Sequence, residues 1–369
     1  MLTKDFDFDL PKNLIAQEPS GVRGEDRLLV LNSKTGEFID KNFSDFPELI
    51  PNDALLVFNN SRVRKARTFA KKENTGANVE FLFLEDFYEG CVWKVLAKRG
   101  KRQNIGDTYI FPDGTRCKII APKRISESVF QNELLQTQFQ ETKKTTSDNS
   151  SEKFLQFEKV LTDKWFETNG RIPLPPYIKR DDNENDASRY QNVYATEVGS
   201  VACPTAGLHF TKELLSKLEA KKIQTLTLTL HVGLGTFLPV RAEKLEDHKM
   251  HFENFFISDE VATKIEKHKA EGKPILAVGT TSLRALEGAA LAGEKCKLKR
   301  GWQSSNIFIY PPYEFKLVDQ LLTNFHTPRS TLLMLVSALA GRENILRAYK
   351  HAVAEKYRFF SYGDAMLIL

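Results

Sequence analysis

The sequence predicts an α/β fold: a discontinuous α/β domain with a mainly parallel sheet, plus an inserted small β-barrel domain. Strand-like and helix-like segments alternate after Gly199, as they do where helices cover a parallel sheet. Residues 64–160 instead hold short, β-rich segments separated by turns. A length of 369 residues is typical of two domains, each with its own hydrophobic core. We therefore expect a catalytic α/β domain at 1–63 and 161–369 and a barrel at 64–160.

The first segments of the chain predict a hairpin and a buried strand. Asp26–Asn32 is apolar and is followed by SKTGEFID, in which Gly36 is the turn residue. Asp53–Asn59 is a short apolar run that ends in the polar residues Asn60–Arg62. Both strands are expected to belong to the α/β domain.

The inserted region predicts a barrel with one long loop. Residues 125–153 are polar and offer little apolar surface for burial, so we expect a mobile loop there. The expected strands are five segments: ARTFA, NVEFLFLE, CVWKVLAKR, DTYIFPDG and RCKIIAP.

The C-terminal half predicts alternating strands and helices. Thr211 is an expected N-cap, and Gln224–His231 alternates Thr and Leu as a half-buried strand does. Ser258 is expected to open a helix that stops at Gly272. The remaining expectations are strands at Pro274–Gly279, Asn306–Pro312 and Asp364–Leu369, and helices at 282–293, Thr331–Leu339 and Glu343–Tyr357.

Composition narrows the functional class. The four cysteines are scattered with no C-x-x-C pair, which argues against a zinc site or a disulfide framework. The N-terminus has no apolar core, and no apolar run reaches 18 residues. We expect a cytoplasmic protein that contacts no membrane, and a monomer.

Four histidines lie between Gly170 and Phe252, among glycines and prolines that predict loops. His209 precedes a helix, whose dipole favours the neutral imidazole of a general base. His231 ends a strand and is followed by Gly233 and Gly235, which let a ligand approach the backbone. Each could equally be a structural hydrogen-bond donor. His248 and His251 could be metal ligands, but no third ligand is apparent.

Thr280–Arg284 follows an apolar strand and begins a helix. Hydroxyls, backbone N–H groups and one arginine at such a turn form a natural anion site at the carboxyl end of a strand. Plain helix capping is the simpler alternative. Cys203 is interpreted as a small buried residue rather than a nucleophile.

Two basic strips indicate a polyanionic partner. Net charge is only +5, but lysines and arginines cluster at residues 62–72 and 94–102. The alternative is that these charges only solvate barrel strands.

Longer motifs resemble one family along essentially the whole chain. They include GRIPLPPYI, PTAGLHFT, LHVGLGTFLPV, VGTTSLRALE and TNFHTPRSTLLMLVSALAG. The sequence is similar to the S-adenosylmethionine:tRNA ribosyltransferase-isomerases of queuosine biosynthesis. The resemblance implies an α/β domain with an inserted barrel. It also implies transfer of the ribosyl group of S-adenosylmethionine onto 7-aminomethyl-7-deazaguanine at the tRNA wobble position, which gives epoxyqueuosine, adenine and methionine.

This chemistry assigns roles to the candidate residues. The sulfonium acidifies the adjacent ribosyl carbon, so His209 or His231 is expected to be the base. A histidine, Asp247 or Glu243 is expected to donate a proton to the departing adenine. No metal is expected. Gly233, Gly235, Thr280, Thr281 and Arg284 are the expected S-adenosylmethionine contacts. Those for tRNA are Arg99, Lys101, Arg102, Arg171 and Tyr177, with Phe210 or Phe237 as further rings for base stacking.

Two rival functions remain open on the sequence. One is an enzyme that acts on a free nucleoside without tRNA. The other is a tRNA-binding module without chemistry.

Overall fold

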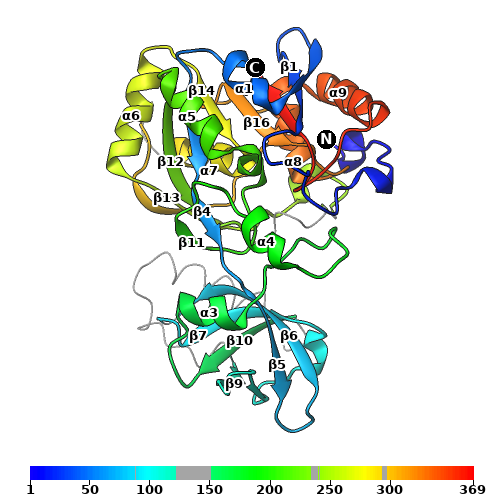
Figure 1. Cartoon of the computed structure of the whole chain (residues 1–369), viewed down its shortest axis with the longest axis vertical. Helices are drawn as coiled ribbons and strands as arrows, with labels where there is room; N and C mark the ends of the chain where they lie inside the picture. Colours follow the sequence, from blue (N-terminus) through cyan, green and yellow to red (C-terminus); the bar gives the residue numbers. More distant parts are fainter. Residues whose placement is uncertain (88, 122–150, 234–239, 241, 293–296) are drawn as a thin grey trace. The chain divides into compact units, whose positions relative to one another are not determined.

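The computed structural model describes the chain except for residues 88, 122–150, 234–239, 241 and 293–296. It divides into two compact units (Figure 1). The α/β unit comprises Met1–Arg62, Pro175–Glu197 and Ala202–Leu369, and the barrel unit comprises Val63–Leu174 and Val198–Val201. The predicted fold class is confirmed. Most of the loop expected at residues 125–153 lies outside the described residues.

A nine-stranded sheet forms the α/β unit, in the order β15-β13-β12-β3-β14-β16-β17-β1-β2. It is mixed, so the expectation of a mainly parallel sheet is wrong. Parallel pairing joins β12, β3, β14 and β16, and also β17 and β1, whereas the other four pairings are antiparallel. The short turn between β1 and β2 explains their antiparallel pairing, whereas longer segments separate the strands of the other three antiparallel pairs. The bounds are β1 Arg27–Leu31, β2 Phe38–Asn42, β3 Leu55–Asn59, β12 Gln224–Leu230, β13 Glu253–Ile257, β14 Ile275–Val278, β15 Gly301–Ser305, β16 Gln320–Asn324 and β17 Ala365–Ile368.

Helices cover both faces of this sheet. Along β3, Leu55 and Val57 join one apolar core, while Leu56 and Phe58 join the other, as alternation along a strand requires. The first core takes in α6 (Asp259–Ala270), α7 (Thr280–Ala292), α8 (Thr331–Ala340) and α9 (Arg342–Ala354), and the second takes in α1 (Phe46–Leu49) and α5 (Lys212–Ala220).

The expected N-caps are confirmed: Thr211 accepts a hydrogen bond from the Leu214 N–H, and Ser258 accepts one from the Val261 N–H. Among the described residues, no helix is both long and apolar enough to cross a membrane.

One expected strand is wrong. Asn306–Pro312 is not a strand, and the strand that pairs with β13 is the preceding segment, β15. Two prolines at 311 and 312 remove ladder donors, and Ile309 is buried in the core of the α/β unit instead. The short strands β13 and β16 and the short helices α3 (Asp163–Asn169) and α4 (Glu184–Arg189) were not expected.

The barrel unit is a closed six-stranded barrel, in the order β10-β7-β6-β5-β8-β9. Five strands match the expected segments, and the sixth, β10, begins at Glu152 inside the segment expected to be a loop. Its core is aromatic, with Phe81, Phe83 and Trp93 all under 3% exposed. The bounds are β5 Arg67–Lys72, β6 Asn78–Asp86, β7 Val92–Ala97, β8 Thr108–Ile110, β9 Arg116–Ile120 and β10 Glu152–Phe157; β4 (Ser61–Val63) and β11 (Glu197–Ser200) pair separately.

Candidate active site

The carboxyl ends of β12, β3, β14 and β16 lie at one edge of the sheet, because these neighbours run parallel. Open α/β sheets bind ligands at this edge. Asn59, the last residue of β3, is fully buried there. Its amide donates to the Leu230 carbonyl at 2.9 Å and to Thr281 Oγ1 at 3.2 Å, and its oxygen accepts from the Leu230 N–H at 3.0 Å. One asparagine therefore ties β3 and β12 to the start of α7.

The β14–α7 turn has the predicted strand–turn–helix form. Gly279 has φ of +90°, which favours glycine, and it leads directly into α7. Thr280 and Thr281 are buried in the first turn of this 13-residue helix. The first N–H groups of a helix lack intrahelical partners, so this end can receive an anion.

Arg284 does not have the free guanidinium expected of an anion ligand. Its Nη1 lies 2.5 Å from Glu253 Oε2, and both side chains are no more than 6% exposed. Glu253 begins β13, so the pair joins α7 to that strand. The charge of Arg284 is thus compensated within the α/β unit.

His209 lies in a closed hydrogen-bonded cluster. Its Nδ1 is 2.7 Å from Asp26 Oδ2, and Asn324, the last residue of β16, donates from Nδ2 to His209 Nε2 at 3.1 Å. Burial alone would raise the pKa of Asp26, but the charge and hydrogen bond of His209 hold it below its usual value. His209 is 2% exposed, and the cavity beside it measures about 20 Å³, room for a single water.

His231 is more accessible at the same edge. It directly follows β12, its backbone N–H donates to the Asn254 carbonyl at 3.1 Å, and its side chain is half-buried. Its ring stacks on Trp302, with centroids 5.8 Å apart and planes 23° apart. Of the two candidate bases, His231 is the less buried.

The segment around His209 is built for close packing. Asn192 Nδ2 donates to the Pro204 carbonyl at 3.0 Å, and a Cβ on Gly207 would lie 2.0 Å from the Tyr194 hydroxyl. Burial raises the pKa of the Cys203 thiol, so it stays a thiol at neutral pH. The structural interpretation of Cys203 therefore fits its surroundings.

The other candidates on this segment are spread out. Gly233 has open space where a Cβ would be, while Gly235 and Phe237 lie outside the described residues. Asp247 is exposed in the short helix Leu245–Asp247. Burial and the neighbouring His251 lower the pKa of His248. In the described part of the chain, no cluster of three His, Cys, Asp or Glu side chains could hold a metal.

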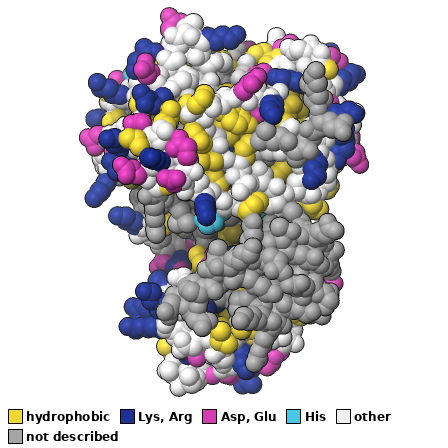
Figure 2. All heavy atoms as spheres, turned by 180° about the vertical axis from the view of Figure 1, so that it is seen from behind, with side chains coloured by type: hydrophobic (Ala, Val, Ile, Leu, Met, Phe, Trp, Pro, Cys, Tyr) yellow, Lys and Arg dark blue, Asp and Glu magenta, His cyan; other side chains and the backbone are white. Residues whose placement is uncertain are grey.

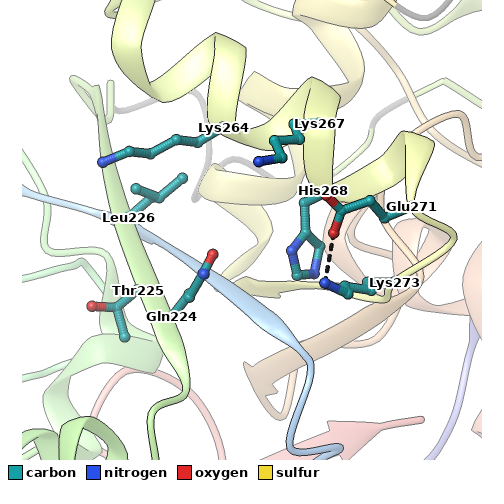
Figure 3. Close-up of a pocket in the computed structure, with 8 residues that line it drawn as sticks. All are labelled: Gln224, Thr225, Leu226, Lys264, Lys267, His268, Glu271 and Lys273. Carbon is teal, nitrogen blue, oxygen red and sulfur yellow. Dashed lines mark hydrogen bonds and ion pairs between the residues drawn. The ribbon is translucent and has the colours of Figure 1, made fainter.

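A separate cavity of about 690 Å³ lies between α6 and the start of β12. Figure 3 shows Lys264 and Lys267 extending from α6 toward β12, and Glu271 paired with Lys273. Gln224 begins β12 and His231 follows its end, so this cavity is at the opposite end of the strand, about 20 Å away at the usual rise. We assign it no part in the active site.

The two basic strips of the barrel unit differ in their pairing. Arg99, Lys101 and Arg102 are exposed around a short 3-10 turn, and none forms an ion pair with another described residue. Figure 2 shows lysines and arginines gathered at one edge of the barrel unit, whereas both signs are interspersed on the α/β unit. Most cations of the first strip, residues 62–72, form ion pairs with carboxylates. These pairs are Arg64–Asp163, Lys65–Glu167, Arg67–Glu80 and Lys72–Asp107.

The remaining tRNA candidates are partly engaged inside their own units. Arg171 is exposed in the barrel unit, with its guanidinium 5.3 Å from the Phe69 ring. Tyr177 stacks on Phe360 at 4.4 Å, and burial raises the pKa of its hydroxyl. Phe210 is fully buried, so the expectation that it stacks on a substrate base is wrong.

Three residues that contact the candidate site residues were not singled out from the sequence: Asn59, Asn324 and Trp302. The signal available for the first two is that each is an asparagine ending an apolar strand, LLVFN and QLLTN. No local sequence signal pointed to Trp302, because the sequence predicted the strand at Asn306–Pro312 and not at β15, which carries this residue.

Comparison with known proteins gives one consistent answer. A family model described as "Queuosine biosynthesis protein" matches residues 3–368. S-adenosylmethionine:tRNA ribosyltransferase-isomerases of Treponema denticola and Borreliella afzelii are 54% and 46% identical over the full chain and 100% and 99% of their own lengths. The crystal structure of S-adenosylmethionine tRNA ribosyltransferase from Thermotoga maritima is 33% identical, with TM-score 0.53 over 99% of this chain and 100% of that one. The chain belongs to the queuosine biosynthesis family of S-adenosylmethionine:tRNA ribosyltransferase-isomerases.

Proposed function

We propose that the chain transfers and isomerises the ribosyl group of S-adenosylmethionine onto 7-aminomethyl-7-deazaguanine at the tRNA wobble position. Adenine and methionine leave, and epoxyqueuosine remains. The observation that carries the proposal is the shared sheet edge, where Asn59 holds the end of β12 beside the start of α7. This contact supports the proposal that His231 and the N-terminus of α7 belong to one site.

His231 is proposed as the base. The sulfonium acidifies the ribosyl carbon bonded to it, and removal of that proton leaves the electron pair on carbon for the rearrangement. A neutral imidazole can accept the proton, and His231 follows the end of a strand with a half-buried side chain. His209 is proposed to position the 205–209 turn instead, because Asp26 and Asn324 occupy both its nitrogens.

The N-terminus of α7 is proposed to bind the methionine carboxylate. Thr280 and Thr281 supply hydroxyls and first-turn N–H groups, and the helix dipole favours an anion. Arg284 supports this end through its ion pair with Glu253 rather than by direct contact. Departing adenine takes its proton from Asp247 or water.

The tRNA is proposed to use the exposed cations Arg99, Lys101 and Arg102 of the barrel unit for phosphate contacts. Arg171 is proposed as a further cation, and Tyr177 to line the α/β unit near Phe360.

Adenine release tests the proposal directly. The protein is incubated with adenine-labelled S-adenosylmethionine and either tRNA carrying 7-aminomethyl-7-deazaguanine, unmodified tRNA or the free base. Release with the modified tRNA alone supports the proposal. Release with the free base at the same rate favours an enzyme that needs no tRNA, and no release with any substrate contradicts the proposed reaction.

A further inference from the structure

One face of the sheet carries aromatic rings at its β12–β13–β15 edge. Phe255 and Ile257 of β13 are buried in the core that includes α7, so the alternate residue Phe256 points to the opposite face. Phe256 pairs in register with Trp302 of β15 and with Thr229 of β12. Because side chains alternate, His231 lies on the same face as Thr229.

These three rings form what we call the aromatic shelf: His231, Phe256 and Trp302. Trp302 lies 5.8 Å from His231 and 5.5 Å from Phe256 between ring centroids. Trp302 is 53% exposed, which is unusual for the largest side chain in a protein. Among the described residues, Trp302 is not one of the apolar side chains packed against either core of the α/β unit. An exposed indole that stacks on the ring of a proposed base is a candidate surface for binding a ligand.

We propose that an unpaired nucleobase of the tRNA stacks on the aromatic shelf, with Trp302 as the main platform. This inference rests on the proposed function and names a positioning residue for it. Unpaired RNA bases stack on aromatic side chains displayed on open sheet faces.

The neighbouring side chains suit a base rather than a phosphate. Asn254 and Ser304, paired in register next to Phe256 and Trp302, occupy the same face and are neutral hydrogen-bonding groups. A small-molecule site would instead enclose most of its ligand. The adenine of S-adenosylmethionine is the alternative source of a purine ring, and the experiment separates the two.

Intrinsic fluorescence can report on this one residue. The chain has three tryptophans, and Trp93 and Trp165 are 2% and 8% exposed within the barrel unit. A base stacked on Trp302 should therefore quench emission from Trp302 selectively. The protein is titrated with an anticodon stem-loop RNA and, separately, with S-adenosylmethionine. We expect quenching by RNA that is lost in Trp302→Phe, whose smaller ring keeps the stack but not the indole emission.

Affinity provides the second readout. Trp302→Ala should weaken RNA binding about 5- to 150-fold, the loss expected for one stacking ring. Trp302→Phe should recover most of it, and affinity for S-adenosylmethionine should stay unchanged in both. Circular dichroism checks that the fold is intact.

Three results would overturn the shelf. They are unchanged RNA affinity in Trp302→Ala, the same RNA quenching in Trp302→Phe, or quenching by S-adenosylmethionine but not by RNA. If wild-type protein still releases adenine from modified tRNA, such a result removes the shelf alone. If it releases none and binds no RNA, the proposed function fails as well.

Discussion

Two histidines at the same edge of the sheet differ in how deeply their side chains are buried. His209 is 2% exposed and held from both sides by Asp26 and Asn324. His231 directly follows β12, is half-buried and stacks on an exposed indole. The comparison teaches that a loop rich in glycine and proline displays a histidine in one case and encloses it in the other. We therefore propose that the less buried ring takes part in the chemistry and that the enclosed one stabilises the turn that carries it.

The largest expected effect is on turnover in His231→Ala. Loss of one general base costs roughly 10²- to 10⁴-fold in rate. Thermal stability should change less than in His209→Ala, because the side chain of His231 is only half-buried. Initial rates of adenine release, with melting temperature as a control, check this. Near-normal turnover would place the base elsewhere.

His209→Ala should act on stability instead. Removing the imidazole would leave the Asp26 carboxylate buried without its hydrogen-bond partner, which costs at least about 1–3 kcal/mol. Asp26→Asn combined with His209→Ala should cost less than the sum of the two single changes. Urea unfolding of the three variants measures the coupling. Additive losses would mean that the pair does not act as a unit.

Arg284→Ala should likewise destabilise the protein, because Glu253 would lose its buried partner. A direct contact with substrate would instead weaken S-adenosylmethionine binding by about 1.5–3 kcal/mol in a variant of normal stability. Thr281→Val is the matched change at the helix N-terminus. It should reduce the free energy of S-adenosylmethionine binding more than it reduces the free energy of unfolding. Calorimetry and urea unfolding together separate the two outcomes.

The barrel cations should affect tRNA alone. Replacing Arg99, Lys101 and Arg102 with Ala should flatten the plot of log K against log salt by up to about 0.7 per charge on single strands. The control is Lys65→Ala with Lys98→Ala, since Glu167 and Glu80 already neutralise those cations. Equal slopes in both variants would mean that exposure without pairing does not mark the tRNA surface.

The smallest expected effect is that of Asp26 on stability at acidic pH. The folded-state pKa of Asp26 is below its usual value, so the unfolded state binds the proton more readily. Its contribution is therefore complete above the ordinary pKa of about 4 and is lost as the pH falls through the folded value. Asp26→Asn should flatten the decline of melting temperature below about pH 4. A matching decline in both proteins would mean that the pKa of Asp26 does not differ between the folded and the unfolded state.

Local signals predicted much of this molecule, and long-range contacts account for what they missed. The caps at Thr211 and Ser258 depend on residues three positions away, and both were predicted correctly. Asn59 acts on residues 171 and 222 positions away, and His209 on one 183 positions away, so no window of sequence contains those interactions. The turn before α7 was predicted from local signals. The role of Arg284 was not, because Glu253 lies on a strand that the sequence did not reveal.

Proton removal itself offers the most direct test of the contrast between the two histidines. S-adenosylmethionine tritiated at the ribosyl carbon bonded to sulfur is mixed with modified tRNA, and single-turnover release of tritium to water is measured per folded molecule. The account predicts release slowed by at least about 10²-fold in His231→Ala and near the wild-type rate in His209→Ala. The reverse pattern would contradict it and make the Asp26–His209 pair the base.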